Sequence, residues 1–191
     1  WDPDQAEATV RDLLELTAAP AGPLGPPDAT IWPETSFPYV LDSAAPLLSV
    51  ARAQAGEGRL YIGAMRAEGG AAWNSLVEIG LDGTPLQTYD KHHLVPFGEY
   101  VPFERLLGAL GLGSMTGYGF TPGPGPRLID AAPLGRALPL ICYEAIFPQD
   151  LRSAPDRPDW LLQVTNDAWF GTFQGPYQHL AQARLRAVES G

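Results

Sequence analysis

The sequence has very little cysteine: one residue, Cys142, in 191. A single thiol excludes an internal disulfide and leaves a structural zinc site without its usual thiolate ligands. Free cysteine is among the most buried residue types, so an inert packing role is the first explanation of Cys142. A reactive role needs support from the residues around it.

The sequence is also poor in basic residues and has no long hydrophobic run. Lysine and arginine number 12 against 22 acidic residues, a formal net charge of −10, and the basic residues are scattered. This excludes an electrostatic footprint for nucleic acid and would repel an anionic lipid surface. No stretch approaches the roughly 20 consecutive apolar residues that cross a bilayer, and no basic segment precedes an apolar one at the N-terminus. We expect the chain as it stands to be soluble and untargeted.

Glycine and proline are abundant, and they are dense in two segments. The chain has 20 prolines and 21 glycines, and the dense segments are Ala18–Asp28 and Gly108–Pro126. Long connections without regular structure are usually functional or disordered. A hydrophobic content of 45% is enough for a core, and no repeat or dividing linker is visible. We therefore expect residues 1–191 to form one domain.

Strand-like and helix-like patterns alternate along the rest of the chain, which is typical of a layered α/β fold. Strands are expected at Ala29–Trp32, Arg59–Met65, Trp73–Leu81, Pro85–Tyr89, Arg136–Cys142 and Trp160–Val164. Helices are expected at Asp4–Thr17, Ala44–Ala55, Phe147–Ser153 and Gln178–Glu189. Asp82-Gly83, between two of the strands, predicts a hairpin turn.

Three polar residues lie where predicted strands end: Glu34, Lys91 and Cys142. In layered α/β folds the carboxyl ends of strands converge on the ligand crevice, so the three side chains could meet. A thiol needs a base or a nearby positive charge to transfer an acyl group. Glu34 could take the thiol proton, and Lys91 could stabilise the oxyanion. The alternatives without a catalytic role are an exposed glutamate, a solvated surface lysine and a core cysteine.

Four local motifs favour the catalytic interpretation: WPE at 32–34, YDKHHLVPFGEYVPFE at 89–104, ICYEAIFP at 141–148 and NDAWFG at 166–171. Together they resemble the nitrilase superfamily, and most closely its apolipoprotein N-acyltransferase branch. HLVPFGEYVP, at 93–102, is the element most specific to that branch. The resemblance covers nearly the whole chain and implies a nitrilase-like αββα four-layer sandwich.

The resemblance also implies roles for individual residues. Glu34 would be the general base, Lys91 the oxyanion stabiliser, Cys142 the nucleophile and Glu99 a second glutamate that holds Lys91 and the incoming amine. Four further residues would form or border the acyl pocket, namely Tyr143, Glu144, Trp169 and Trp1. Both tryptophans could equally be core residues.

Neither a metal nor another cofactor is expected. His92 and His93 would point in opposite directions in an extended segment, and no second cluster supplies metal-ligand spacing. His179, on the last predicted helix, is expected to be structural.

The reaction implied by the resemblance has two half-steps. Cys142 takes an acyl chain from a membrane phospholipid as a thioester, and the N-terminal amine of a diacylglyceryl-cysteine lipoprotein then accepts it. The family works at the bacterial inner membrane, with this domain on the periplasmic or outer face. We expect the chain to be a fragment of a longer membrane protein, without the first and last strands of the sandwich.

Two rival functions stay open. A soluble nitrilase-type amidase would use the same Glu, Lys and Cys to transfer the acyl group to water, and a catalytically silent nitrilase-like module would only bind. The intact set of three residues weighs against the silent module. The loop Gly108–Pro126 weighs against the amidase if it is a mobile lid that admits a lipid tail, but it could also be an ordinary connection.

Overall fold

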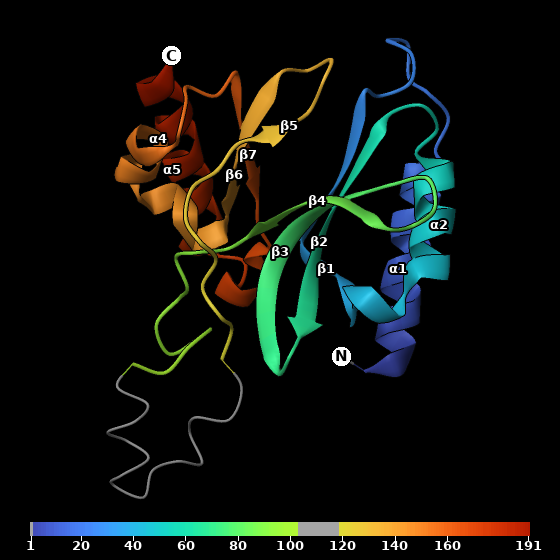
Figure 1. Ribbon diagram of the computed structural model, residues 1–191, viewed down its shortest axis with the longest axis horizontal. Coiled ribbons are helices and arrows are strands. Elements are labelled where there is room, and N and C mark those ends of the chain that lie inside the picture. The colour runs from blue at the N-terminus through green and yellow to red at the C-terminus, as the bar shows by residue number, and fades with distance from the viewer. Residues whose placement is uncertain (1, 103–118) are drawn as a thin grey trace, which may run out of the picture.

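A computed structural model describes residues 2–102 and 119–191, apart from the side chain of Trp169. Two β-sheets pack face to face, and a pair of helices lies outside each sheet, which gives four layers (Figure 1). The first sheet contains, in order, β1 (Ala29–Val40), β2 (Arg59–Glu68), β3 (Ala71–Ile79) and β4 (Pro85–Asp90). The second contains β5 (Ile129–Asp130), β6 (Arg136–Ile141) and β7 (Trp160–Val164).

The helices flank these sheets. The first sheet is covered by α1 (Pro3–Thr17) and α2 (Ala45–Gln54), and the second by α4 (Pro148–Ser153) and α5 (Gln174–Ser190). Short 3₁₀ helices connect the layers: η1 (Leu41–Ser43), η3 (Cys142–Ile146) and η4 (Asp167–Phe170). None of the helices in the described parts of the chain has both the length and the hydropathy that a membrane span needs.

Strand β2 lies in the middle of the molecule and is buried on both faces. Leu60 and Ile62 pack toward α1 and α2, whereas Tyr61 between them packs toward the second sheet. Successive strand residues point to opposite faces, so a strand with two covered faces is a continuous apolar run rather than an alternating one. Burial of each large aliphatic side chain contributes about 1.5–3 kcal/mol to the free energy of unfolding. Because β2 has side chains in both cores, it contributes to the stability of both.

Helix α1 fixes the start of β1. Asp2 caps the helix with its side chain, and Val10 and Leu14, four residues apart, face the core. The last residue, Thr17, accepts a hydrogen bond of 2.9 Å from the indole nitrogen of Trp32 in β1. This contact holds the strand two residues before Glu34.

All six predicted strands and all four predicted helices are present, and the αββα sandwich is confirmed. The prediction for the first strand is wrong in length, because β1 continues beyond Trp32 to Val40. The strand contains Pro33 and Pro38, which are tolerated because β1 is at the edge of its sheet. The hairpin turn is confirmed: Gly83 has a φ of 80°, and the Gly80 amide donates to the Thr84 carbonyl. The additional strands expected beyond residues 1–191 stay a prediction.

Candidate active site

The two sheets bring Glu34, Lys91 and Cys142 together at one end of the sandwich. Lys91 directly follows β4, and Cys142 directly follows β6. Glu34 does not follow a strand as expected but lies inside β1, where the pairing with β2 shifts between Trp32 and Phe37. The irregularity turns Glu34 inward, and its side chain is buried.

The irregularity in β1 depends on a glycine in the neighbouring strand. A Cβ atom at Gly63 of β2 would overlap the Pro33 carbonyl and lie 2.7 Å from the Cα atom of Glu34. Thr35, the next residue of β1, has a φ of 43°, which non-glycine residues adopt rarely. A close approach of two backbones therefore sets the position of Glu34.

Lys91 is the only lysine of the chain, and it is 1% exposed. Its Nζ donates to Oε1 of Glu99 at 2.9 Å and to Oε1 of Glu34 at 3.2 Å. Burial opposes the charged form, but the two carboxylates outweigh it and raise the pKa of Lys91. Lysine is almost never fully buried unless it is paired, and here it lies between two carboxylates.

Asn74 of β3 joins the two glutamates from the other side, a residue that the sequence reasoning missed. Its Nδ2 donates to Oε1 of Glu34 at 2.8 Å and to Oε1 of Glu99 at 3.0 Å. Asn74 is 2% exposed and lies two residues before Leu76 on the same face of the strand. A polar residue at a core-facing position was the available signal.

The Cys142 thiol lies in reach of charges of both signs. Burial raises its pKa to about 11, the negative charge of Glu34 adds to this rise, and Lys91 opposes it. The thiol is therefore protonated at neutral pH and needs a base to become a nucleophile. The backbone of Cys142 has a φ of 49°, and the chain turns sharply there from β6 into η3.

Glu144 holds this turn against the segment that carries Lys91. Its side chain is fully buried, and one carboxylate oxygen accepts from the Ile141 amide while the other accepts from the His92 amide, both at 2.7 Å. The hydroxyl of Tyr89 donates to the carboxylate as well. These contacts favour a positioning role for Glu144 over the predicted contact with an acyl chain. Tyr143 is half-buried, and its pocket role stays a prediction.

His179 of α5, which was expected to be structural, anchors the backbone of the nucleophile. Its Nε2 lies 2.9 Å from the Cys142 carbonyl oxygen, and its Nδ1 lies 2.8 Å from Oδ1 of Asp167. The contact joins the last helix to the active-site turn across 37 residues of sequence. No motif in the sequence pointed to it.

The segment after Lys91 is not extended, so the prediction that His92 and His93 point in opposite directions is wrong. Both rings turn toward Asp150 of α4, and their centroids lie 4.4 Å apart. Burial opposes the charged form of His92, but the Glu144 and Asp150 carboxylates raise the pKa of His92.

The chain returns to the site after residue 118. The amide of Phe120 donates to the Glu99 carbonyl, and the amide of Gly123 donates to the Lys91 carbonyl. Most of the predicted lid, together with Trp1 and the side chain of Trp169, lies outside the described residues.

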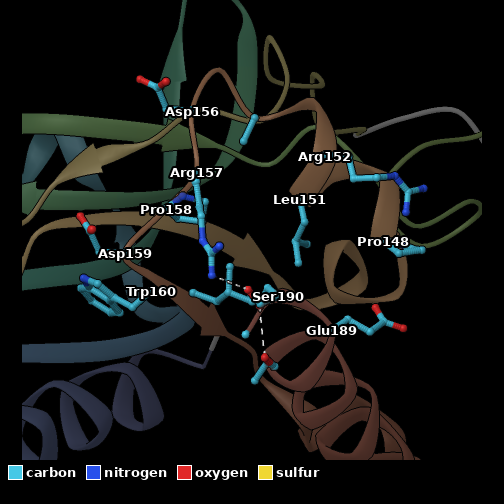
Figure 2. Close-up of a pocket in the computed structure, with 14 residues that line it drawn as sticks. Pro148, Leu151, Arg152, Asp156, Arg157, Pro158, Asp159, Trp160, Glu189 and Ser190 are labelled. Carbon is cyan, nitrogen blue, oxygen red and sulfur yellow. Dashed lines mark hydrogen bonds between the residues drawn. The ribbon is translucent and has the colours of Figure 1, made fainter.

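A separate hollow of about 1200 Å³ lies between α4, the end of α5 and β7 (Figure 2). Its walls include Leu151, Trp160 and Ser190, but none of the residues around Cys142. We therefore place the candidate active site at the cluster of polar side chains formed by Glu34, Lys91, Glu99 and Cys142, called the polar cluster below, and not in this hollow.

Solved structures of other proteins share this fold. A carbon-nitrogen hydrolase from Helicobacter pylori G27 matches with a TM-score of 0.66 at 17% identity, over 95% of this chain and 64% of that one. An amidase from Nesterenkonia sp. matches with a TM-score of 0.61 at 21% identity, over 97% of this chain and 67% of that one. The fold is therefore that of the nitrilase-like α/β sandwiches.

The chain belongs to the carbon-nitrogen hydrolase family, whose model matches residues 4–191. Among curated proteins, the apolipoprotein N-acyltransferase of Brucella suis is 44% identical over 100% of this chain, and that of Bradyrhizobium diazoefficiens is 41% identical over 95%. The matched regions make up 38% and 36% of those relatives, so the chain spans less than two fifths of their length.

Proposed function

We propose that residues 1–191 are the catalytic domain of an apolipoprotein N-acyltransferase, in which Cys142 carries the acyl chain. The buried cluster of Lys91 between Glu34 and Glu99, beside the Cys142 thiol, supports the proposal most strongly. Identity of 41–44% to relatives with that name supports the choice of branch. In a variant of the Nesterenkonia amidase, the active-site cysteine carries a covalently added acetamide moiety.

In the first half-step the thiol loses its proton to Glu34, and the sulfur attacks the ester carbonyl of a phospholipid. Lys91 donates to the oxyanion that develops on that carbonyl oxygen. The C–O bond of the ester breaks, Glu34 returns the proton to the departing alcohol of the lysophospholipid, and a thioester remains on Cys142. Because the thiol pKa is about 11, this step depends on a base within reach.

In the second half-step the acceptor is the N-terminal amine of a diacylglyceryl-cysteine lipoprotein. The neutral amine attacks the thioester, the C–S bond breaks, and an amide forms. The amine gives up one proton, which passes through Glu34 to the sulfur and restores the thiol. Glu99 and Asn74 keep Lys91 and Glu34 in place through both half-steps.

The proposed site of action is the outer face of the bacterial inner membrane, with membrane anchoring supplied by the rest of a longer protein. Exposed aromatic side chains near the polar cluster fit a lipid substrate. Phe97, two residues before Glu99, is 79% exposed, and Phe173, between η4 and α5, is 83% exposed.

The test is covalent capture on the full-length protein. A phospholipid with a labelled acyl chain should leave a hydroxylamine-sensitive adduct on Cys142, detected by peptide mass spectrometry. Cys142→Ala should carry none, and Glu34→Gln should form it about 10²- to 10⁴-fold more slowly because the thiol loses its base. Glu57→Gln, which alters an exposed carboxylate, is the matched control. A labelled adduct that persists in Cys142→Ala would exclude Cys142 as the acyl carrier.

A further inference from the structure

A second cluster of polar side chains lies beside the active site and takes no part in the two half-steps. It consists of His92, His93 and Asp150, and one ligand atom from each residue lies within 4.8 Å of the other two. The Nε2 atom of His92 is 3.1 Å from Oδ2 of Asp150, and the Nε2 atom of His93 is 3.1 Å from Oδ1. The two histidines follow Lys91, whereas Asp150 comes from α4, 57 residues beyond His93.

These distances fit a coordination sphere. Nitrogen and oxygen ligands bind Zn²⁺ at about 2.0–2.2 Å, so two neighbouring ligand atoms lie roughly 2.8–3.1 Å apart on an octahedral ion and roughly 3.3–3.6 Å apart on a tetrahedral one. Both separations from Asp150, at 3.1 Å, match the octahedral spacing and are within a few tenths of an ångström of the tetrahedral one. Two imidazoles and one carboxylate are a donor set suited to zinc and neighbouring transition metals. An ion could enter with small movements of three side chains.

The ligands are held before any ion binds. Oε1 of Glu144 lies 2.6 Å from Nδ1 of His92 and also accepts from the His92 amide, so the ring is fixed by its far nitrogen. A carboxylate on the second ring nitrogen is the arrangement that orients most metal-binding histidines. The His93 ring stacks on Phe147 with centroids 3.9 Å apart. Two of the three ligands therefore have restrained orientations.

The charge around the cluster favours a cation. Glu144 and Asp150 supply two carboxylates, both buried, and the Tyr89 hydroxyl lies 3.1 Å from Nδ1 of His92. The His93 side chain is 33% exposed, which leaves a route from solvent and room for water as a further ligand.

We propose that His92, His93 and Asp150 bind one divalent transition-metal ion of the zinc type. The ion would link the segment that carries Lys91 to α4, which begins just after the η3 turn of Cys142. Its role would be to stiffen the frame of the active site, because none of its ligands touches Lys91 Nζ or the thiol among the contacts of the described residues.

The test is a metal titration of the full-length protein after removal of metal with a chelator. Zn²⁺ should bind with a stoichiometry of one per chain and raise the unfolding temperature, and Co²⁺ should give a visible absorption band typical of nitrogen and oxygen ligands. His93→Ala and Asp150→Asn should lose both effects. Asp156→Asn, which alters an exposed aspartate in the loop after α4, should keep them.

The variants need a check that they fold. Unfolding curves in chelator should show cooperative transitions for the wild type and for His93→Ala, whose side chain is partly exposed; His93→Gln serves if the alanine variant fails. Absence of Zn²⁺ and Co²⁺ binding to the wild type would overturn the proposal, whatever the acyl-transfer activity. Binding that survives both ligand substitutions would overturn it as well, because the ion would then lie elsewhere.

Discussion

The protonation of Cys142 depends on its burial and on two opposing charges on neighbouring side chains. Burial and Glu34 raise the pKa of its thiol to about 11, and Lys91 counteracts only part of this rise. At neutral pH roughly one thiol in 10⁴ would then be ionised, which separates this site from one with a resting thiolate and ammonium pair. In the proposed mechanism, nucleophilic sulfur therefore depends on proton transfer to Glu34 when a substrate is in place.

Alkylation as a function of pH measures this directly. Without substrate, we expect the rate of iodoacetamide addition to Cys142 to rise tenfold per pH unit and to level off near pH 11. Mass spectrometry of the Cys142 peptide gives the rate, and residues 1–191 contain no other thiol that could contribute. A plateau already reached at pH 8 would mean a resting thiolate held by Lys91, and Glu34 would lose its role as base.

The sequence predicted Glu34, Lys91, Glu99 and Cys142 because their local motifs resemble those of a known family. It could not predict Asn74 or His179, because each acts by reaching from one layer of the sandwich to another. For Glu144, its place beside Cys142 in the sequence suggested a contact with substrate, and that role stays a prediction. The structure shows that the 3₁₀ turn directs its carboxylate into the core.

At the level of whole elements, the meeting of β1 and β2 decides where the base lies. The two strands pair in parallel up to Trp32, shift register, and resume at Phe37, and Glu34 falls within this irregularity. Gly63 permits it because it has no side chain to meet the Pro33 carbonyl. A bulged strand beside a glycine is a common way to re-aim a functional side chain.

Gly63→Ala tests this dependence. A Cβ atom there has no space, so β1 must move away, and we expect a loss of about 1–3 kcal/mol of unfolding free energy. Thioester formation on Cys142 should slow by more than tenfold, since Glu34 would move with the strand. Gly22→Ala is the matched control, because a Cβ atom at Gly22 meets nothing within 4 Å. Normal acylation by Gly63→Ala would show that Glu34 is positioned by other contacts.

The elements that the sequence missed are short or depend on distant partners. β5 has two residues and exists only through its pairing with β6. The continuation of β1 from Pro33 to Val40 was not predicted, and it depends on pairing with β2 that resumes at Phe37. Hydrophobic periodicity identifies long elements with one buried face, but it does not identify a two-residue strand or the continuation of an edge strand.

For the molecule as a whole, net charge and surface composition bear on how the proposed enzyme would contact a lipid. With a formal charge of −10 the chain gains nothing from an anionic membrane surface, so contact with lipid must be apolar. Phe97 lies on the segment that carries Glu99, and Leu81 lies at the turn between β3 and β4; both side chains are 79% exposed. Substitutions of Phe97 and Leu81 can therefore be compared to learn whether an effect depends on closeness to Glu99 or only on the loss of an exposed apolar side chain.

In the full-length protein, Phe97→Ser should slow acylation by phospholipid in membranes several-fold. It should leave the reaction with a short, water-soluble ester nearly unchanged, because Glu34, Lys91 and Cys142 are intact. Leu81→Ser should change neither rate. Equal losses of rate on both substrates would mean that Phe97 supports the fold rather than lipid binding. An unaltered rate with phospholipid would show that Phe97 has no role in lipid entry and would favour the amidase alternative.

The chain leaves the active site at Glu99 and is back beside it at Phe120, whose amide donates to the Glu99 carbonyl at 2.7 Å. The Gly123 amide donates in the same way to the Lys91 carbonyl. Synthesis runs from the N-terminus, so both carbonyls lack these partners until residues 120–123 have left the ribosome. The segment that carries Lys91 and Glu99 is therefore completed late, by backbone contacts that do not depend on which side chains residues 120–123 carry.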